Sequence, residues 1–138
     1  MMLTKPLYRL LTILFFALST PALASVSLMT GATLPGAERL SSSDSEARIL
    51  DDVLRRSLLG SGQTCLFTEH HRYDRGLGYA QVTLLKSSLE LSGWKLEELS
   101  PFLPSKIGLW LLSKGRDVVL VFLIPLERVG YVSFCELL

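Results

Sequence analysis

The two histidines of this chain, His70 and His71, are adjacent in a polar stretch that runs from Glu69 to Asp74. Imidazole and carboxylate groups bind transition metals, and a histidine beside a carboxylate can also act as a general base. Neighbouring side chains on a strand point to opposite faces, so the two histidines could share one ion only in a loop. Because the chain has neither the H-x-H nor the H-x-x-x-H spacing of metal sites, we expect a solvated loop and no cofactor. His70 and His71 are the only metal candidates.

Two cysteines, Cys65 and Cys135, lie 70 positions apart. They do not form the C-x-x-C spacing of a redox pair, and a structural zinc site needs about four ligands. In an oxidising compartment two such thiols tend to close, so we expect a disulfide between them. Two buried free thiols are the alternative. A nucleophilic pair of Cys65 with a histidine would compete with the disulfide, because an oxidised sulfur cannot attack a substrate.

The sequence lacks the motifs of other common catalytic and phosphate-binding sites. The chain holds no G-x-S-x-G nucleophile elbow, and the glycine-containing segment 60–64 lacks the Lys-Ser/Thr ending of a phosphate-binding loop. Glu97 and Glu98 are adjacent on an expected strand, so their carboxylates diverge. Aromatic residues such as Trp94 and Trp110 are expected in the core. We therefore expect no catalytic residue, and the sequence does not define the ligand-binding residues.

The N-terminal segment has the order of a secretory signal. Lys5 and Arg9 make a basic start, residues 10–18 form an uncharged apolar run, and small residues occupy positions −3 and −1 of a cleavage site after Ala24. The apolar run is shorter than the about 20 residues of a membrane span, so we expect no stable span after cleavage. An uncleaved anchor is the alternative. The protein is therefore expected to be exported, either periplasmic or secreted.

Composition and charge are typical of a folded domain and do not indicate a strongly charged binding partner. The chain has 138 residues, of which 49% are hydrophobic and 20% charged, with a formal net charge of +1. This balance excludes a disordered chain and provides no basic surface for nucleic acid. Loss of Lys5 and Arg9 with the signal would leave the remaining chain close to neutral. Charge therefore predicts no particular partner.

The hydrophobic pattern changes period along the chain. Apolar residues recur with helical spacing over 43–59, where Ser43 and Glu46 suit a capping box, and again over 77–92. The segment 118–124 is apolar on both faces, which is typical of a central strand. Strands are expected at 37–40, 65–68, 94–100, 106–114, 117–124 and 129–137.

These elements predict an α+β fold. The last four expected strands follow one another in a meander, which favours an antiparallel sheet of about four to six strands. We expect both helices to pack on one face of this sheet. The domain organisation is a signal peptide at 1–24, a lead-in segment at 25–34 and a single α+β domain at 35–138.

A short set of motifs resembles small exported bacterial α+β domains, most of which have no known function. Pro35-Gly36-Ala37 opens the domain, and the second helix closes with Ser92-Gly93-Trp94-Lys95 before the strands. The resemblance covers about 34–136 and departs at the helix 43–59 and the long link after it. It implies the fold and carries no catalytic residue over.

Three functions are compatible with these observations. The first is an exported non-enzymatic domain that binds a protein, an envelope component or a small apolar ligand. The second is a small hydrolase or metal-dependent enzyme centred on the loop Glu69–Asp74. The third is a secreted inhibitor that uses the same loop as its contact surface.

Overall fold

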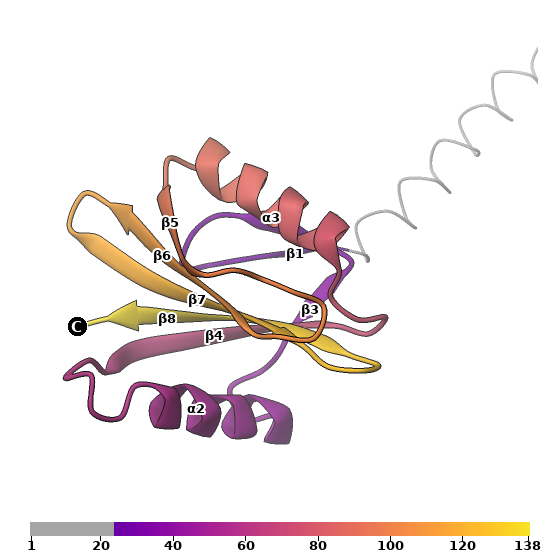
Figure 1. The fold of residues 1–138 in the computed structure, drawn as a ribbon, viewed down its shortest axis with the longest axis horizontal. Helices are drawn as coiled ribbons and strands as arrows, with labels where there is room; N and C mark the ends of the chain where they lie inside the picture. Colours follow the sequence, from indigo (N-terminus) through magenta and orange to yellow (C-terminus); the bar gives the residue numbers. More distant parts are fainter. Residues whose placement is uncertain (1–23) are drawn as a thin grey trace, which may run out of the picture.

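The computed structural model describes residues 24–138, so the expected signal segment lies outside the described residues apart from Ala24. The chain folds into the elements shown in Figure 1: β1 (Ala24–Val26), β2 (Thr33–Pro35), β3 (Ala37–Arg39), α2 (Ser45–Ser57), β4 (Cys65–Tyr73), α3 (Tyr79–Leu91), β5 (Lys95–Ser100), β6 (Gly108–Lys114), β7 (Asp117–Pro125) and β8 (Gly130–Leu137).

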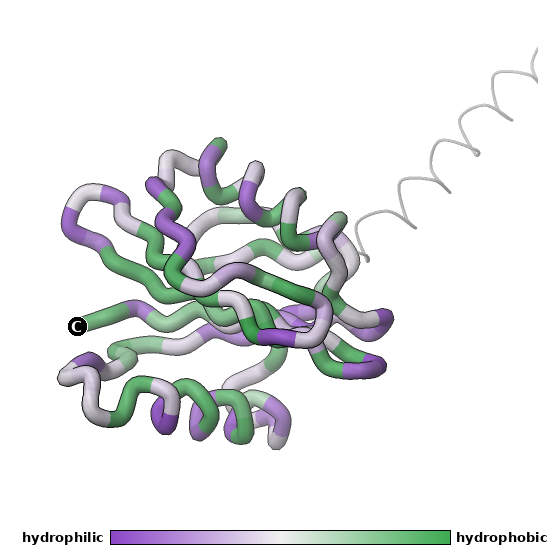
Figure 2. The backbone as a smooth tube through the Cα atoms, in the orientation of Figure 1, coloured by the Kyte–Doolittle hydropathy of each residue, from purple (hydrophilic) through white to green (hydrophobic). Residues whose placement is uncertain are grey.

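Six strands form one antiparallel sheet in the order β3-β4-β8-β7-β6-β5. The strands β5 to β8 are consecutive neighbours, which confirms the expected meander and the α+β class. β7 lies inside the sheet, and its residues from Val119 to Ile124 are all buried. Figure 2 colours this strand as hydrophobic along most of its length. The expectation of a central strand at 118–124 is therefore confirmed.

The two helices lie on opposite faces of the sheet, so the expectation that both pack on one face is wrong (Figure 1). On one face, Leu85 of α3 belongs to the same core as Val121 of β7. On the other, Leu54 of α2 packs in a second core with Leu120. The physical reason is that β7 is apolar at consecutive residues and does not alternate with polar ones. Both faces of the sheet must therefore be removed from water.

The segment expected as a lead-in is part of the fold. β1 pairs antiparallel with β2 in a separate two-stranded sheet. Ala32 and Leu34 are fully buried in the core beneath α3. The indole Nε1 of Trp94 donates a 2.9 Å hydrogen bond to the carbonyl of Thr30, which fixes the turn of this small sheet. Residues 24–35 therefore complete one layer of the domain.

The N-cap of α2 lies one residue later than expected. Asp44, not Ser43, is the N-cap residue, and its side chain accepts from the backbone N–H of Glu46. The Ser43 hydroxyl bonds to Ser41 instead. The Glu46 carboxylate does not return to the helix end, because it binds Arg72 of the sheet. The capping box is thus replaced by a single cap and a tertiary ion pair.

The cysteine pairing is confirmed. The Sγ atoms of Cys65 and Cys135 are 2.10 Å apart, and their Cα atoms are separated by 5.2 Å. The bond joins the first residue of β4 to β8, its neighbour in the sheet. The disulfide therefore fixes the start of β4 to its neighbour near one edge of the sheet.

Candidate functional site

The expected loop at Glu69–Asp74 is wrong, because residues 69–73 continue the strand β4. His70 and His71 are buried, with exposed fractions of 4% and 0%. They point to opposite faces of the sheet, as adjacent strand residues must, and therefore do not converge. The polar sequence is tolerated inside the sheet because each imidazole has partners that lie far away in the chain.

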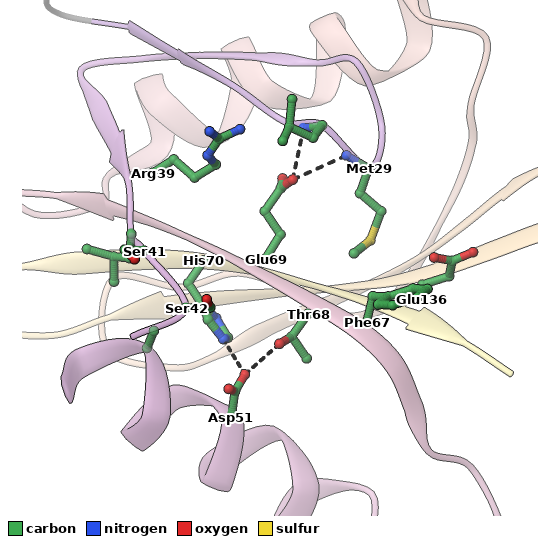
Figure 3. Close-up of a pocket in the computed structure, with 13 residues that line it drawn as sticks. Met29, Arg39, Ser41, Ser42, Asp51, Phe67, Thr68, Glu69, His70 and Glu136 are labelled. Atoms are coloured by element: carbon green, nitrogen blue, oxygen red, sulfur yellow. Dashed lines mark hydrogen bonds and ion pairs between the residues drawn. The ribbon is translucent and has the colours of Figure 1, made fainter. Parts of the chain in front are cut away.

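On the α3 face, His71 links the N-terminal hairpin to the sheet. Its Nδ1 lies 2.8 Å from the hydroxyl of Ser25, and its Nε2 lies 2.8 Å from a carboxylate oxygen of Glu69. The other oxygen of Glu69 accepts from the backbone N–H groups of Leu28 and Met29, at 2.8 and 3.2 Å (Figure 3). Glu69 thus holds the turn between β1 and β2.

The pKa of Glu69 is lowered. Burial by itself would raise this pKa, but hydrogen bonds from His71 and from the backbone of the β1–β2 turn stabilise the ionised form more strongly. An ionised carboxylate accepts hydrogen bonds and donates none, so Nε2 of His71 is the donor toward Glu69. In the neutral imidazole, Nδ1 then accepts from the Ser25 hydroxyl.

On the α2 face, His70 links the helix to the sheet. Its Nδ1 lies 2.7 Å from the hydroxyl of Ser133 on β8, and its Nε2 lies 2.6 Å from Oδ1 of Asp51 on α2. The hydroxyl of Thr68 donates to the same oxygen at 2.6 Å. Figure 3 shows Asp51 reaching up from the helix to both partners.

A third polar link lies nearer the start of α2. Arg72 donates to Glu46 at 2.6 Å, and the hydroxyl of Tyr131 donates to the other oxygen of that carboxylate. Burial and the neighbouring Glu46 raise the pKa of Tyr131 to about 12, so the phenol stays protonated and acts as a donor. Asp74, the last residue of the expected loop, lies 2.8 Å from Nε of Arg72. The two contacts of Glu46 attach α2 to the sheet.

Both histidines lie in a serine–histidine–carboxylate chain, an arrangement that can activate a serine nucleophile. Ser133, however, has no exposed surface. Ser25 is partly exposed, yet neither of the two cavities described below is lined by it. In the described part of the chain, no group of three or more side chains is arranged to hold a metal ion. The histidine chains therefore act first as polar ties between layers.

The open part of the β4 edge is the feature that the sequence did not reveal. β3 pairs only with residues 71–73 of β4, and one more bond joins the N–H of Leu40 to the carbonyl of His70. The chain then leaves the sheet toward α2. Within residues 24–138, no strand pairs with 65–69 on the side away from β8.

Two cavities adjoin this open part of β4. The first, of about 500 Å³, lies where a continuation of β3 would run, and Figure 3 shows residues of α2 and of the β1–β2 turn on its two sides. The second, of about 690 Å³, lies between the C-terminal end of α2, the following loop and the start of β4. Thr68, Phe67 and Asp51 line both cavities. The two spaces therefore follow one strand edge.

Apolar side chains are exposed around the same edge. Phe67 is 62% exposed and Leu66 is 49% exposed on β4 itself. Leu28 of the β1–β2 turn and Leu59 after α2 are about three-quarters exposed on either side. The ladder between β4 and β8 shifts register between Cys65 and Phe67, so this part of the strand is irregular as well as uncovered.

The opposite edge of the sheet has a different surface. β5 carries the exposed charges Lys95, Glu97 and Glu98 along its six residues. Charges on an edge strand discourage pairing with another chain. Residues 65–68 of β4 carry no charge. Of the two edges, β4 is the one without this protection.

Comparisons of the chain with family models, with curated proteins and with solved structures found no match. The resemblance to small exported bacterial domains therefore stays a prediction. In the described residues, no helix has the length and apolar character needed to cross a bilayer.

Proposed function

We propose that this chain is an exported, non-enzymatic domain that binds an extended segment of a partner polypeptide by strand addition to β4. The observation that carries the proposal is the unpaired edge at residues 65–69, whose first four residues carry no charge and which two cavities adjoin. An added strand obtains affinity from main-chain hydrogen bonds and specificity from pockets that receive alternate side chains.

The backbone of β4 offers groups for such a strand. The carbonyl of His70 points toward β3, since it accepts from Leu40. Backbone groups of every second residue on a strand point the same way, so the N–H and carbonyl of Thr68 face the open edge. Free hydrogen-bonding groups beside apolar surface suit a protein partner better than a small apolar ligand, which would leave those groups unmet.

The site is also firmly supported. The disulfide at Cys65 fastens the start of β4, Asp51 ties α2 to Thr68, and Glu69 holds the β1–β2 turn. A preformed groove lowers the entropic cost of binding. The expected disulfide is in turn compatible with an oxidising compartment outside the cytoplasm.

Peptide selection tests the binding function. Peptides enriched from a random twelve-residue display library on the immobilised oxidised protein would be synthesised, and their affinities measured for the parent and for Phe67→Lys. This substitution places a charge on the exposed edge, so we expect binding to be lost. Leu99→Lys, at a 48% exposed residue on β5, is the matched control and should bind normally.

Hydrogen exchange provides a second readout. The amide of Thr68 should exchange more slowly when a selected peptide is bound, because a strand would cover it. Selected peptides that bind Phe67→Lys as well as the parent, without protecting this amide, would contradict strand addition at β4.

Export has its own test. Mass spectrometry of the exported protein should find Ser25 as the first residue. An intact Met1 in the membrane fraction would instead support the uncleaved anchor.

A hydrolase is the second candidate, and one observation favours it. The Ser25 hydroxyl, His71 and Glu69 form a continuous chain of contacts of 2.8 Å, and Ser25 is partly exposed. A fluorophosphonate probe, which labels activated serines, tests this reading. Labelling of the parent that disappears in Ser25→Ala but persists in Ser133→Ala would favour the enzyme over the binding domain.

A further inference from the structure

We infer that the polypeptide segment bound at β4 carries a lysine or arginine side chain that pairs with Asp51. This inference rests on the proposed binding function and specifies the chemistry of the partner. It follows from the charges that line the cavity of about 500 Å³ beside β4 and from a carboxylate on the α2 side that keeps an oxygen available.

The walls of this cavity carry an excess of negative charge. Asp51, Glu69 and Glu136 contribute three carboxylates, and Arg39 contributes one guanidinium. Glu69 is 10% exposed and already accepts from His71 and from the β1–β2 turn. Its charge therefore acts through the field of the cavity and not through a free oxygen. A cationic side chain entering this space would meet complementary charge on both sides of β4.

Asp51 is the carboxylate on the α2 side of β4 that is placed to make a direct contact, whereas Glu136 lies opposite Phe67 in the ladder between β4 and β8. Its side chain is 47% exposed, and its bonds to His70 and Thr68 both use Oδ1. Among residues 24–138 the second oxygen, Oδ2, has no hydrogen-bond partner and can accept from a ligand. Asp51 also lines both cavities, so it lies beside the path of a strand added along 65–69.

The face that this basic residue occupies follows from the alternation of the strand. Side chains of an added strand would point by turns toward α2 and toward the β1–β2 turn. Asp51 lies on the α2 side, whereas the exposed Phe67 and Leu28 offer apolar contact elsewhere along the edge. The preferred segment is therefore extended and mostly apolar, with a lysine or arginine at one position that faces α2.

Three synthetic nine-residue peptides test the inference. Each is acetylated and amidated, alternates threonine and valine, and differs only at the central residue, which is lysine, norleucine or glutamate. Affinities would be measured by calorimetry with the oxidised protein. We expect lysine to bind about fivefold more tightly than norleucine, which corresponds to an ion pair at a half-exposed carboxylate. Glutamate should bind least, and added salt should reduce the advantage of lysine.

The variant Asp51→Asn isolates the charge. Its amide oxygen can still accept from Thr68 and His70, so the link between α2 and the sheet is kept. The advantage of lysine over norleucine should disappear. Asp52→Asn is the matched control, since its carboxylate pairs with Arg55 and Arg56 and does not line the cavity. That variant should keep the preference.

The outcomes separate this inference from the proposed function. Equal affinities of the three peptides, all lost in Phe67→Lys, would overturn the basic preference and leave strand addition standing. Failure of all three peptides to bind would also overturn the basic preference. Strand addition to β4 would then still be tested by the peptides selected from the library. A protein that is dimeric in solution and becomes monomeric on Phe67→Lys would assign the edge to a second copy and refute both.

Discussion

Replacement of Glu69 provides the sharpest test of how the N-terminal hairpin is held. In Glu69→Ala three donors lose their acceptor: the ring of His71 and the backbone N–H groups of Leu28 and Met29. Leu28 is 75% exposed, so water can replace its bond at small cost. Met29 is only partly exposed, and His71 has no exposed surface.

The magnitude follows from these exposures. A buried donor without a partner costs about 1–3 kcal/mol, and a partly buried amide costs less. We therefore expect Glu69→Ala to lower the free energy of unfolding by about 2–4 kcal/mol. Glu69→Gln keeps one acceptor oxygen and should lose about half as much. Glu98→Ala removes an exposed carboxylate of β5 and should change stability by less than about 0.5 kcal/mol.

The same interaction predicts a pH dependence. The pKa of Glu69 is lower in the folded protein than its ordinary value of 4.5. Its carboxylate therefore stabilises the fold fully at higher pH, and this contribution is lost as the pH falls below 4.5 through the folded-state pKa. The difference in stability between the parent and Glu69→Gln should be constant near neutrality and should shrink in acid.

Urea unfolding followed by tryptophan fluorescence, from pH 7 down to pH 3, measures both quantities. A loss for Glu69→Ala no larger than that of Glu98→Ala would refute the reasoning about the buried imidazole. A difference between the parent and Glu69→Gln that grows in acid would refute the assigned ionisation.

Two further predictions concern packing and the disulfide. A Cβ on Gly130 would lie 2.3 Å from Cβ of Leu77, so Gly130→Ala should lower the free energy of unfolding by about 3 kcal/mol. Gly78→Ala is the control and should lower it by less than about 1 kcal/mol, because the nearest contact of its Cβ is a flexible side-chain end. Thermal unfolding of both variants measures the two losses, and equal losses would contradict the prediction. Replacement of Cys65 and Cys135 by serine should lower stability by about 2–5 kcal/mol, and the parent protein purified without reductant should show no labelled thiol before reduction and two after it.

Much of the fold was predictable because its signals are local. The apolar stretch of β7 identifies a strand covered on both faces, and the helical spacing at 43–59 identifies α2 within two residues at each end. The disulfide was predictable from the expected compartment and the count of cysteines. Each of these inferences needs only neighbouring residues or composition.

The two helices were expected on one face of the sheet, although the sequence of β7 contains the reason for their opposite placement. A strand that alternates apolar and polar residues needs cover on one face, but Leu120, Val121 and Phe122 are consecutive and all buried. With only two helices available, each face receives one. Segregated helices often share one face of a sheet, but here both faces of β7 carry apolar side chains that must be covered.

The histidines were misplaced for a different reason. A run of five polar or charged residues, 69–72 and 74, interrupted only by Tyr73, is typical of a loop when judged from local composition. Inside the sheet the cost of burying such residues is met by partners that are 46 and 63 positions away, Ser25 for His71 and Ser133 for His70. No local pattern predicts contacts at that separation.

The open edge of β4 could not be predicted at all, because it is a property of the topology. Its cause is a mismatch between two neighbours in the sheet: β3 has three residues and β4 has nine. Even so, the local sequence separates the two edges of the sheet once their order is known, since β5 carries charges that oppose pairing and residues 65–68 of β4 carry none. An edge stretch that is both uncovered and uncharged can pair with another chain, and the proposed strand addition rests on this property. The hydrogen bonds that hold Asp51 and Glu69 on either side of this edge involve the same residues that give the adjoining cavity its negative charge.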